Sequence, residues 1–216
     1  RETGRVENLS KSLQGEFSRS GLGIAHTRWA THGAVTVSNT HPHISHDKKF
    51  ALVHNGVIEN FSSLKNFLLK EGVQFSSDTD SEVLCNLIAY HYNELPEGDD
   101  RFIQSVSAAL AKSRGAYGIA VMCIDYPDMM VGARRGSPLV VGIGEDANFI
   151  ASDASAFVGR AKEAVFLKDG ELAILRGSDF RITNQEGHEA EAIAQPLEQT
   201  LEEVELGDFG SYMEKE

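Results

Sequence analysis

The spacing of apolar residues changes near residue 115 and predicts two different kinds of secondary structure. Before this point, apolar positions recur at helical spacing in three segments. After it, short apolar runs alternate with Pro, Gly and Asp turns, which is typical of β-strands. Helices and strands are therefore segregated along the chain, and we find no internal repeat. This pattern predicts a single α+β layered domain.

Capping signals mark where the three predicted helices begin. Asn60 is an N-cap candidate for the first helix, and the second begins at the capping box Thr79-x-x-Glu82. The capping box places Asp80 in the first helical turn, where the helix dipole favours a carboxylate. The third helix follows a loop at residues 96–100. The predicted apolar faces contain Leu64, Phe67 and Leu68, then Val83, Leu84, Leu87 and Ile88, then Ile103, Val106 and Leu110.

Nine segments are predicted to be strands. Residues 22–30 form a strand candidate that turns at His32-Gly33, and residues 50–54 form a second one that ends at the turn signal Asn55-Gly56. Asp169-Gly170 is a two-residue hairpin signal between two later strands. The seven later candidates are residues 118–125, 129–134, 139–143, 148–151, 165–167, 171–175 and 180–183.

Composition indicates an acidic globular protein. The chain has 216 residues, of which 41% are hydrophobic, and a formal net charge of -12, which disfavours binding to nucleic acid or to anionic membranes. Cys85 and Cys123 both lie in apolar runs, so we expect reduced core thiols rather than a disulfide. No signal peptide or membrane-spanning run is found, and the expected location is the cytoplasm.

Histidines are concentrated in one part of the chain, where six of the eight fall between His26 and His54. Their spacing does not match a zinc motif, because His41 and His43 flank a proline and do not share a helix face. We therefore expect them to serve in structural hydrogen bonds and expect no metal. Phosphate-binding glycine loops are also missing from the sequence, so no cofactor is predicted.

Three polar groups at the ends of apolar runs suggest a site for an amino acid. Arg28 can bind a carboxylate through two hydrogen bonds, Asp80 can pair with an ammonium, and Asn55 with the N–H of Gly56 can stabilise an oxyanion. Taken singly, they could be a surface ion pair, a helix cap and a tight turn. Together they predict a pocket for an amino acid with a reactive carbonyl, although neither cysteine is placed as an activated nucleophile.

Seven motifs carry a resemblance to a known family. They occur in order between about Gly21 and Leu175, and they resemble the glutaminase domains of glutamine–fructose-6-phosphate aminotransferases, which are class II glutamine amidotransferases. Amidophosphoribosyltransferases share some of these segments, whereas RWATHG and GSPLVVGIG favour the sugar-phosphate enzymes. The motifs are RWATHG (28–33), HPH (41–43), HNGVIEN (54–60), TDSE (79–82), RGAYG (114–118), RRGSPLVVGIG (134–144) and ASD (151–153).

The resemblance implies a fold, a reaction and a set of roles. The fold would be the N-terminal-nucleophile hydrolase αββα sandwich, with two stacked antiparallel sheets between helix layers. An N-terminal cysteine would attack the side-chain amide of L-glutamine, and the released ammonia would pass through a channel to a sugar-isomerase domain that binds fructose 6-phosphate. By motif, the glutamine site would consist of Arg28, Thr31, His32 and Asp80, the oxyanion hole of Asn55 and Gly56, and the gate of Trp29.

The resemblance also implies what lies outside these residues. Residues 1–205 would be a glutaminase domain without its start, and residues 206–216 would begin a linker to the isomerase domain of a homo-oligomeric parent. The nucleophilic cysteine would then precede Arg1. Two alternatives remain: another class II amidotransferase, of the amidophosphoribosyltransferase or asparagine synthetase type, or a non-catalytic glutamine-binding fragment.

Overall fold

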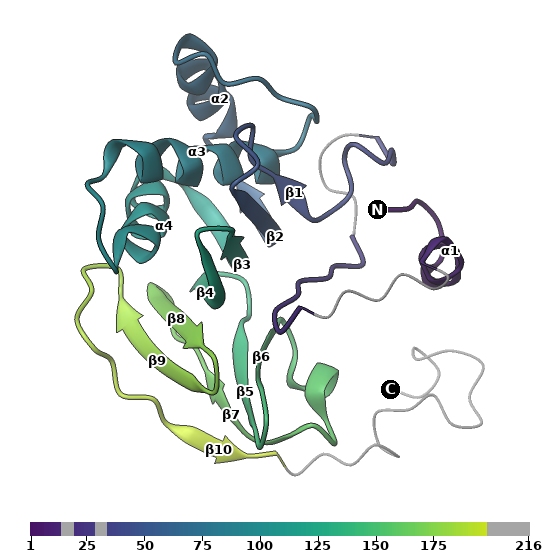
Figure 1. Ribbon diagram of the computed structural model, residues 1–216, viewed down its shortest axis with the longest axis vertical. Helices are drawn as coiled ribbons and strands as arrows, with labels where there is room; N and C mark the ends of the chain where they lie inside the picture. The colour runs from purple at the N-terminus through teal and green to yellow at the C-terminus, as the bar shows by residue number, and fades with distance from the viewer. Residues whose placement is uncertain (14–19, 29–33, 198–216) are drawn as a thin grey trace.

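Two antiparallel sheets pack face to face (Figure 1) in the computed structural model, which describes residues 1–13, 20–28 and 34–197. The first sheet has six strands in the order β1 (His43–Ile44), β2 (Phe50–Ile58), β3 (Gly115–Cys123), β4 (Tyr126–Arg135), β8 (Glu171–Arg176) and β9 (Asp179–Asn184). The second has four, in the order β10 (Ala194–Pro196), β7 (Ala161–Phe166), β5 (Val140–Gly144) and β6 (Asn148–Ala151).

The core between the sheets follows from the two-residue period of the strands. Ala120 and Met130 from the first sheet pack with Val141 and Val165 from the second in one buried apolar cluster. Alternate residues face the opposite way. Val140 on β5 therefore lies in a separate cluster on the outer face of the second sheet, together with Phe157 of the 3-10 helix η1 (Ala154–Phe157).

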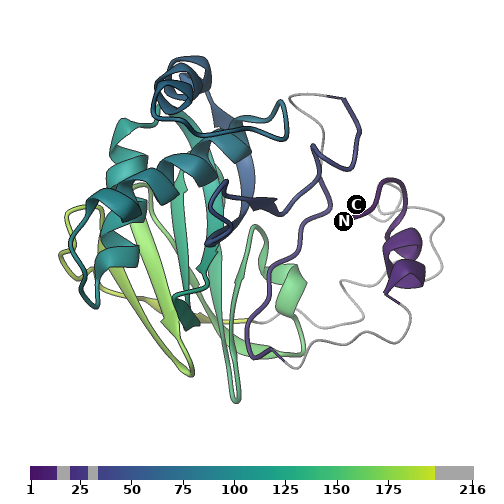
Figure 2. The same cartoon turned by 45° about the horizontal axis from the view of Figure 1, so that its top comes forward.

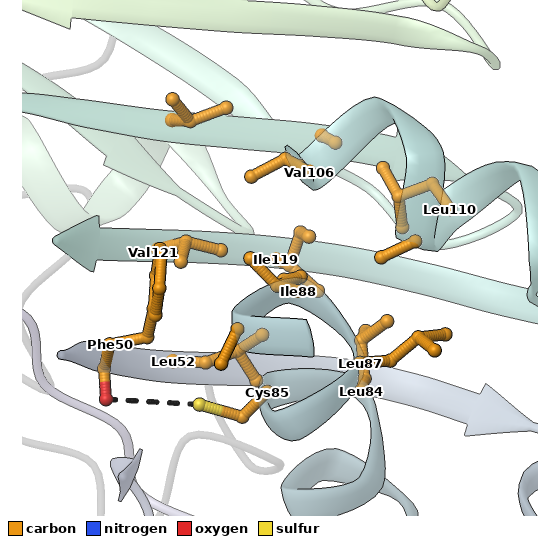
Figure 3. Packing of buried hydrophobic residues seen from close by; sticks show 14 of the residues in the cluster. Phe50, Leu52, Leu84, Cys85, Leu87, Ile88, Val106, Leu110, Ile119 and Val121 are labelled. Atoms are coloured by element: carbon orange, nitrogen blue, oxygen red, sulfur yellow. Dashed lines mark hydrogen bonds between the residues drawn. The ribbon is translucent and has the colours of Figure 1, made fainter. Parts of the chain in front are cut away.

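Two helices, α3 (Asp80–Glu94) and α4 (Arg101–Lys112), cover the outer face of the six-stranded sheet, and α2 (Phe61–Lys70) packs on α3, as Figure 2 shows. Figure 3 shows the packing of α3 and α4 on β2 and β3, where Leu84, Ile88 and Val106 lie against Leu52 and Ile119. Burial is nearly complete along α3 from Asp80 to Ala89, so this helix lies at the centre of the domain.

The predicted α+β sandwich of two stacked antiparallel sheets is confirmed. A layer of helices lies on the outer face of the six-stranded sheet. On the outer face of the four-stranded sheet, the described residues contribute the short helix η1. The structure also contains a short N-terminal helix, α1 (Val6–Ser12), which the sequence did not predict. Among the described residues, no helix combines the length and apolar character needed to cross a bilayer.

One predicted turn and one predicted hairpin are wrong. Asn55 and Gly56 lie inside β2, paired with Gly118 and Tyr117 of β3, so the strand continues to Ile58. Asp169-Gly170 does not close a hairpin, because β7 pairs with β5 and β10 whereas β8 pairs with β4 and β9. The turn instead carries the chain from one sheet to the other.

One predicted strand is also wrong. Residues 22–28 are described without secondary structure, and the turn predicted at His32-Gly33 lies outside the described residues.

Candidate active site

The oxyanion residues proposed from sequence lie on β2, where the backbone departs from ordinary strand geometry. Gly56 has a φ of +128°, a conformation that L-residues with side chains rarely adopt. A Cβ at this position would lie 2.2 Å from the carbonyl oxygen of Ala116 on β3. Only glycine therefore fits here, and its peptide can take an orientation that no other residue would allow at this point of the strand.

The side chain of Asn55 is oriented by a histidine. His26 Nε2 lies 2.7 Å from Asn55 Oδ1. Since a carboxamide oxygen only accepts hydrogen bonds, His26 donates through Nε2, and the NH₂ group of Asn55 is left to donate elsewhere. A structural hydrogen bond was predicted for the histidines of this segment, but the partner could not be, because this contact joins residues 29 positions apart and has no local signal.

Asp80 is placed beside this strand by the start of α3. Its side chain is buried, with the residue 3% exposed, and Oδ2 accepts a hydrogen bond from the Ile58 N–H at 2.8 Å. Ile58 is two residues beyond Gly56, so the structure brings Asp80 close to the oxyanion residues along one strand. The sequence predicted this position in the first turn of α3 correctly.

A hydrogen-bond network fixes the start of α3. Thr79 is the N-cap, and its Oγ1 accepts from the Glu82 N–H at 3.2 Å. The reciprocal half of the predicted capping box is not formed. Instead, the Glu82 carboxylate accepts from the backbone N–H and the hydroxyl of both Ser76 and Ser77. These hydrogen bonds outweigh burial and lower the pKa of Glu82 below its ordinary value.

The charge of Asp80 is not neutralised by its neighbour His54. His54 Nδ1 lies 3.9 Å from Asp80 Oδ2 and 3.0 Å from the Ser81 hydroxyl. Burial lowers the pKa of His54 even though Asp80 acts in the opposite direction, so the imidazole is neutral at pH 7. Within the described ranges, no Lys or Arg pairs with Asp80. A buried carboxylate without a cationic partner is costly, which favours a ligand that brings a positive charge.

Arg28 lies on the wall of a neighbouring cavity of about 420 Å³. His26 and His41 line the same cavity, and α1 contributes Val6 and Leu9. Arg28 Nη1 donates to the carbonyl oxygen of Ala34 at 3.3 Å. Asn55 and Asp80 are not in the cavity lining, so His26 is the residue that connects the cavity to the oxyanion residues.

The remaining candidates, Trp29, Thr31 and His32, lie outside the described residues.

Three histidines pack next to the site: His26 and His41, which are half-buried, and His43, which is buried. The ring centroids of His26 and His41 are 4.2 Å apart, and those of His41 and His43 are 4.8 Å apart. Burial and the neighbouring imidazoles lower the pKa of His41 to about 2, and burial lowers that of His43 to about 4. His43 Nε2 lies 3.1 Å from Thr79 Oγ1, which links this group to the cap of α3. As far as the structure describes the chain, no three His, Cys, Asp or Glu side chains are arranged to hold a metal ion.

Neither cysteine is suited to be the nucleophile. Cys85 and Cys123 are both buried and free, as the sequence predicted. Burial raises the pKa of the Cys123 thiol to about 11 and raises that of Cys85 further above its ordinary value. Among the described residues, the site therefore contains the groups predicted for binding and for oxyanion stabilisation but no activated thiol.

Comparison with known proteins identifies the family. The model of the glutamine amidotransferase domain matches residues 10–165. This chain belongs to the glutamine amidotransferase domain family. Among curated relatives of this amidotransferase domain, the glutamine–fructose-6-phosphate aminotransferase (isomerizing) of Chlamydia abortus is 49% identical over 172 residues, which are 80% of this chain and 28% of the relative. The enzyme of the same name from Aquifex aeolicus is 41% identical over 216 residues, all of this chain and 36% of the relative.

A solved structure supports the same family. The glutamine phosphoribosylpyrophosphate amidotransferase of B. subtilis, complexed with ADP and GMP, aligns with this amidotransferase domain at a TM-score of 0.60 and 27% identity. The alignment covers 74% of this chain and 34% of that one. The domain thus spans about a third of the length of the curated relatives that it matches.

Proposed function

We propose that this domain binds L-glutamine and hydrolyses its side-chain amide to glutamate and ammonia. The observation that carries the proposal is the geometry of Asn55-Gly56. The backbone of Gly56 is held at a φ of +128°, and the carboxamide oxygen of Asn55 is engaged by His26, so two N–H donors are available for one oxyanion. Preorganised donors of this kind stabilise the tetrahedral intermediate of acyl transfer.

The α-amino and α-carboxylate groups of glutamine would be bound on either side of these donors. Asp80 Oδ2 is taken by the Ile58 N–H, so Oδ1 would accept from the substrate ammonium. Arg28 would bind the α-carboxylate from the cavity wall. We propose that Thr31 and His32 complete this pocket and that Trp29 closes over the bound substrate.

The nucleophile would be the N-terminal cysteine that the family resemblance implies, outside these 216 residues. Its thiolate would attack the amide carbon, and the negative charge that develops on the carbonyl oxygen would be stabilised by Asn55 and Gly56. Collapse of this intermediate would release ammonia and leave a thioester. Water would then cleave the thioester to give glutamate and restore the thiol.

For the full-length protein, we propose that the ammonia aminates fructose 6-phosphate to give glucosamine 6-phosphate. The curated relatives at 41% to 49% identity carry a name that states this transfer, whereas the structural match to the phosphoribosylpyrophosphate enzyme is at 27% identity. We also propose a C-terminal sugar-isomerase domain, a homo-oligomeric assembly and a cytoplasmic location.

The proposal is tested with the purified full-length protein. Glutamine-dependent amination of fructose 6-phosphate should be detected, and phosphoribosyl pyrophosphate or aspartate should not replace this acceptor. Product formation from either of these instead would contradict the acceptor assignment. Glutamine binding without hydrolysis, and without covalent labelling by a cysteine-reactive glutamine analogue, would indicate a binding module.

The substrate clamp is tested by an Arg28→Ala variant. Its KM for glutamine should rise at least tenfold, while hydrolysis of an amide that lacks the α-carboxylate should change little. An equal effect on both substrates would show that Arg28 does not bind the α-carboxylate.

A further inference from the structure

The loop after β4, which begins at Gly136, reaches the oxyanion residues on β2 across the intervening strand β3. Ser137 Oγ lies 3.0 Å from the position that a Cβ on Gly56 would take. On the neighbouring strand, a Cβ on Gly118 would lie 3.0 Å from the Pro138 carbonyl oxygen and 3.4 Å from Ser137 Cβ. Gly118 is the pairing partner of Asn55. The loop therefore occupies the space that two glycines leave open over the oxyanion residues.

Ser137 fills the space that a side chain at position 56 would occupy. The same space is bounded by the carbonyl oxygen of Ala116, at 2.2 Å from the position of the missing Cβ. A peptide with a glycine φ of +128° is free to rotate unless its surroundings restrict it. Pairing with β3 restricts Gly56, and Ser137 and Ala116 bound the space beside it, so we expect a shift of the loop to change the direction of the Gly56 N–H.

The position of the loop is set by the turn that connects the two sheets. Asp169 Oδ1 accepts from the Gly136 N–H at 3.0 Å and lies 3.2 Å from Arg134 Nε. The Gly170 N–H donates to the Arg134 carbonyl oxygen at 2.8 Å. Arg134 Nη1 also donates to the Leu167 carbonyl oxygen. Asp169-Gly170 therefore holds both the end of β4 and the first residue of the loop.

We propose that Asp169 is a positioning residue for the oxyanion hole, acting through Gly136 and Ser137 on the peptide of Gly56. The inference rests on the proposed glutaminase function and extends it to a turn between the sheets. Asp169 is not itself assigned to the substrate, and its side chain is 58% exposed. An exposed ion pair contributes little to stability, so a role in positioning predicts a loss of rate without a matching loss of stability.

A matched pair of aspartates tests this inference in the full-length protein. Asp128 forms an ion pair with Arg176 at 2.9 Å, and its side chain is 52% exposed. It lies on β4, whose opposite end leads into the loop. Asp169→Ala should lower kcat for glutamine hydrolysis on the order of tenfold and leave KM within about twofold, because sub-ångström misplacement of a catalytic group can cost this much. Asp128→Ala should leave both constants unchanged.

Two further variants separate positioning from a general structural effect. Asp169→Asn keeps an acceptor for the Gly136 N–H, so its kcat should be closer to that of the wild type than to that of Asp169→Ala. Ser137→Ala removes the hydroxyl beside Gly56 and should lower kcat by a smaller factor than Asp169→Ala. Hydrogen exchange of a peptide that contains Gly56 should become faster in Asp169→Ala but not in Asp128→Ala, and this readout does not depend on activity.

The outcomes distinguish the inference from the function on which it rests. If the wild-type protein hydrolyses glutamine and Asn55→Ala abolishes this activity, but Asp169→Ala matches Asp128→Ala in kcat and in hydrogen exchange, only the positioning role is overturned. A wild-type protein that does not hydrolyse glutamine would overturn the proposed function, and the inference with it.

Discussion

His26 and Asn55 lie 29 residues apart in sequence, yet His26 Nε2 approaches Asn55 Oδ1 to 2.7 Å. This contact connects the wall of the cavity that contains Arg28 to the strand that carries the oxyanion residues. It also determines which end of the Asn55 carboxamide can face a substrate. His26 therefore lies between the proposed binding cavity and the proposed oxyanion residues.

Replacement of His26 should impair catalysis more than binding. In His26→Ala, the Asn55 carboxamide loses its partner and can rotate, so we expect kcat for glutamine hydrolysis to fall roughly tenfold with a smaller change in KM. His26→Gln retains an N–H donor and should recover part of the loss. Steady-state kinetics would measure both. The exposed His188 provides the control, and an effect of His188→Ala equal to that of His26→Ala would contradict this role.

Replacement of Gly56 should destabilise the fold. Gly56→Ala places a Cβ 2.2 Å from the Ala116 carbonyl oxygen at a φ of +128°, so overpacking and backbone strain add together. We expect the free energy of unfolding to fall by about 2–5 kcal/mol, measured by urea denaturation.

A Gly170→Ala variant distinguishes the cost of backbone strain from the cost of overpacking at Gly56. Gly170 also has a positive φ, +84°, but a Cβ there would have no neighbour within 4 Å. Gly170→Ala should therefore cost only about 1 kcal/mol. Equal losses in the two variants would show that close approach to Ala116 does not matter.

The free energy of unfolding should decrease on mild acidification because of His41 and His43. The pKa of His41 is lowered from 6.5 to about 2, and that of His43 from 6.5 to about 4. Below pH 6.5 the unfolded chain therefore binds more protons than the folded chain, so stability is fully present above this pH and falls as the pH is lowered. Each histidine contributes a slope of up to about 1.4 kcal/mol per pH unit.

Urea denaturation between pH 7 and pH 5.5 would measure this slope. His41→Gln should show a shallower dependence on pH than the wild type, whatever its stability at pH 7. The pKa of Glu82 lies below its ordinary 4.5, so this carboxylate does not titrate in the chosen window. An unchanged slope in His41→Gln would contradict the lowered pKa of His41 in the folded protein.

The helices and the position of Asp80 could be predicted because their signals are local. A capping box and an i, i+4 apolar pattern are contained within about one or two turns of chain, and α3 begins where they indicate. Asn55-Gly56 and Asp169-Gly170 were misassigned for the opposite reason. Asn55-Gly56 favours a tight turn in isolation, but pairing of β2 with β3 overrides that preference. Asp169-Gly170 does form a turn, but the strands on either side of it pair with other strands, so no hairpin results.

The candidate site was only partly accessible from sequence. Residue types indicated Arg28, Asn55 and Asp80, because a cation, an amide beside glycine and an anion suit an amino-acid substrate. The supporting residues His26, Ala116 and Ser137 act through contacts made by folding, and no spacing rule connects them to Asn55 or Gly56. Such contacts can be found only once the strands are in register.

The central claim, that Asn55 and Gly56 stabilise the oxyanion of glutamine hydrolysis, is tested most directly by kcat and KM of Asn55→Ala in the full-length protein. Loss of one oxyanion donor should lower kcat on the order of 100- to 1000-fold and leave KM for glutamine nearly unchanged. Asn93→Ala, which removes an exposed amide hydrogen-bonded to Asp47, should behave as the wild type. A wild-type kcat in Asn55→Ala, or a loss confined to KM, would contradict the account.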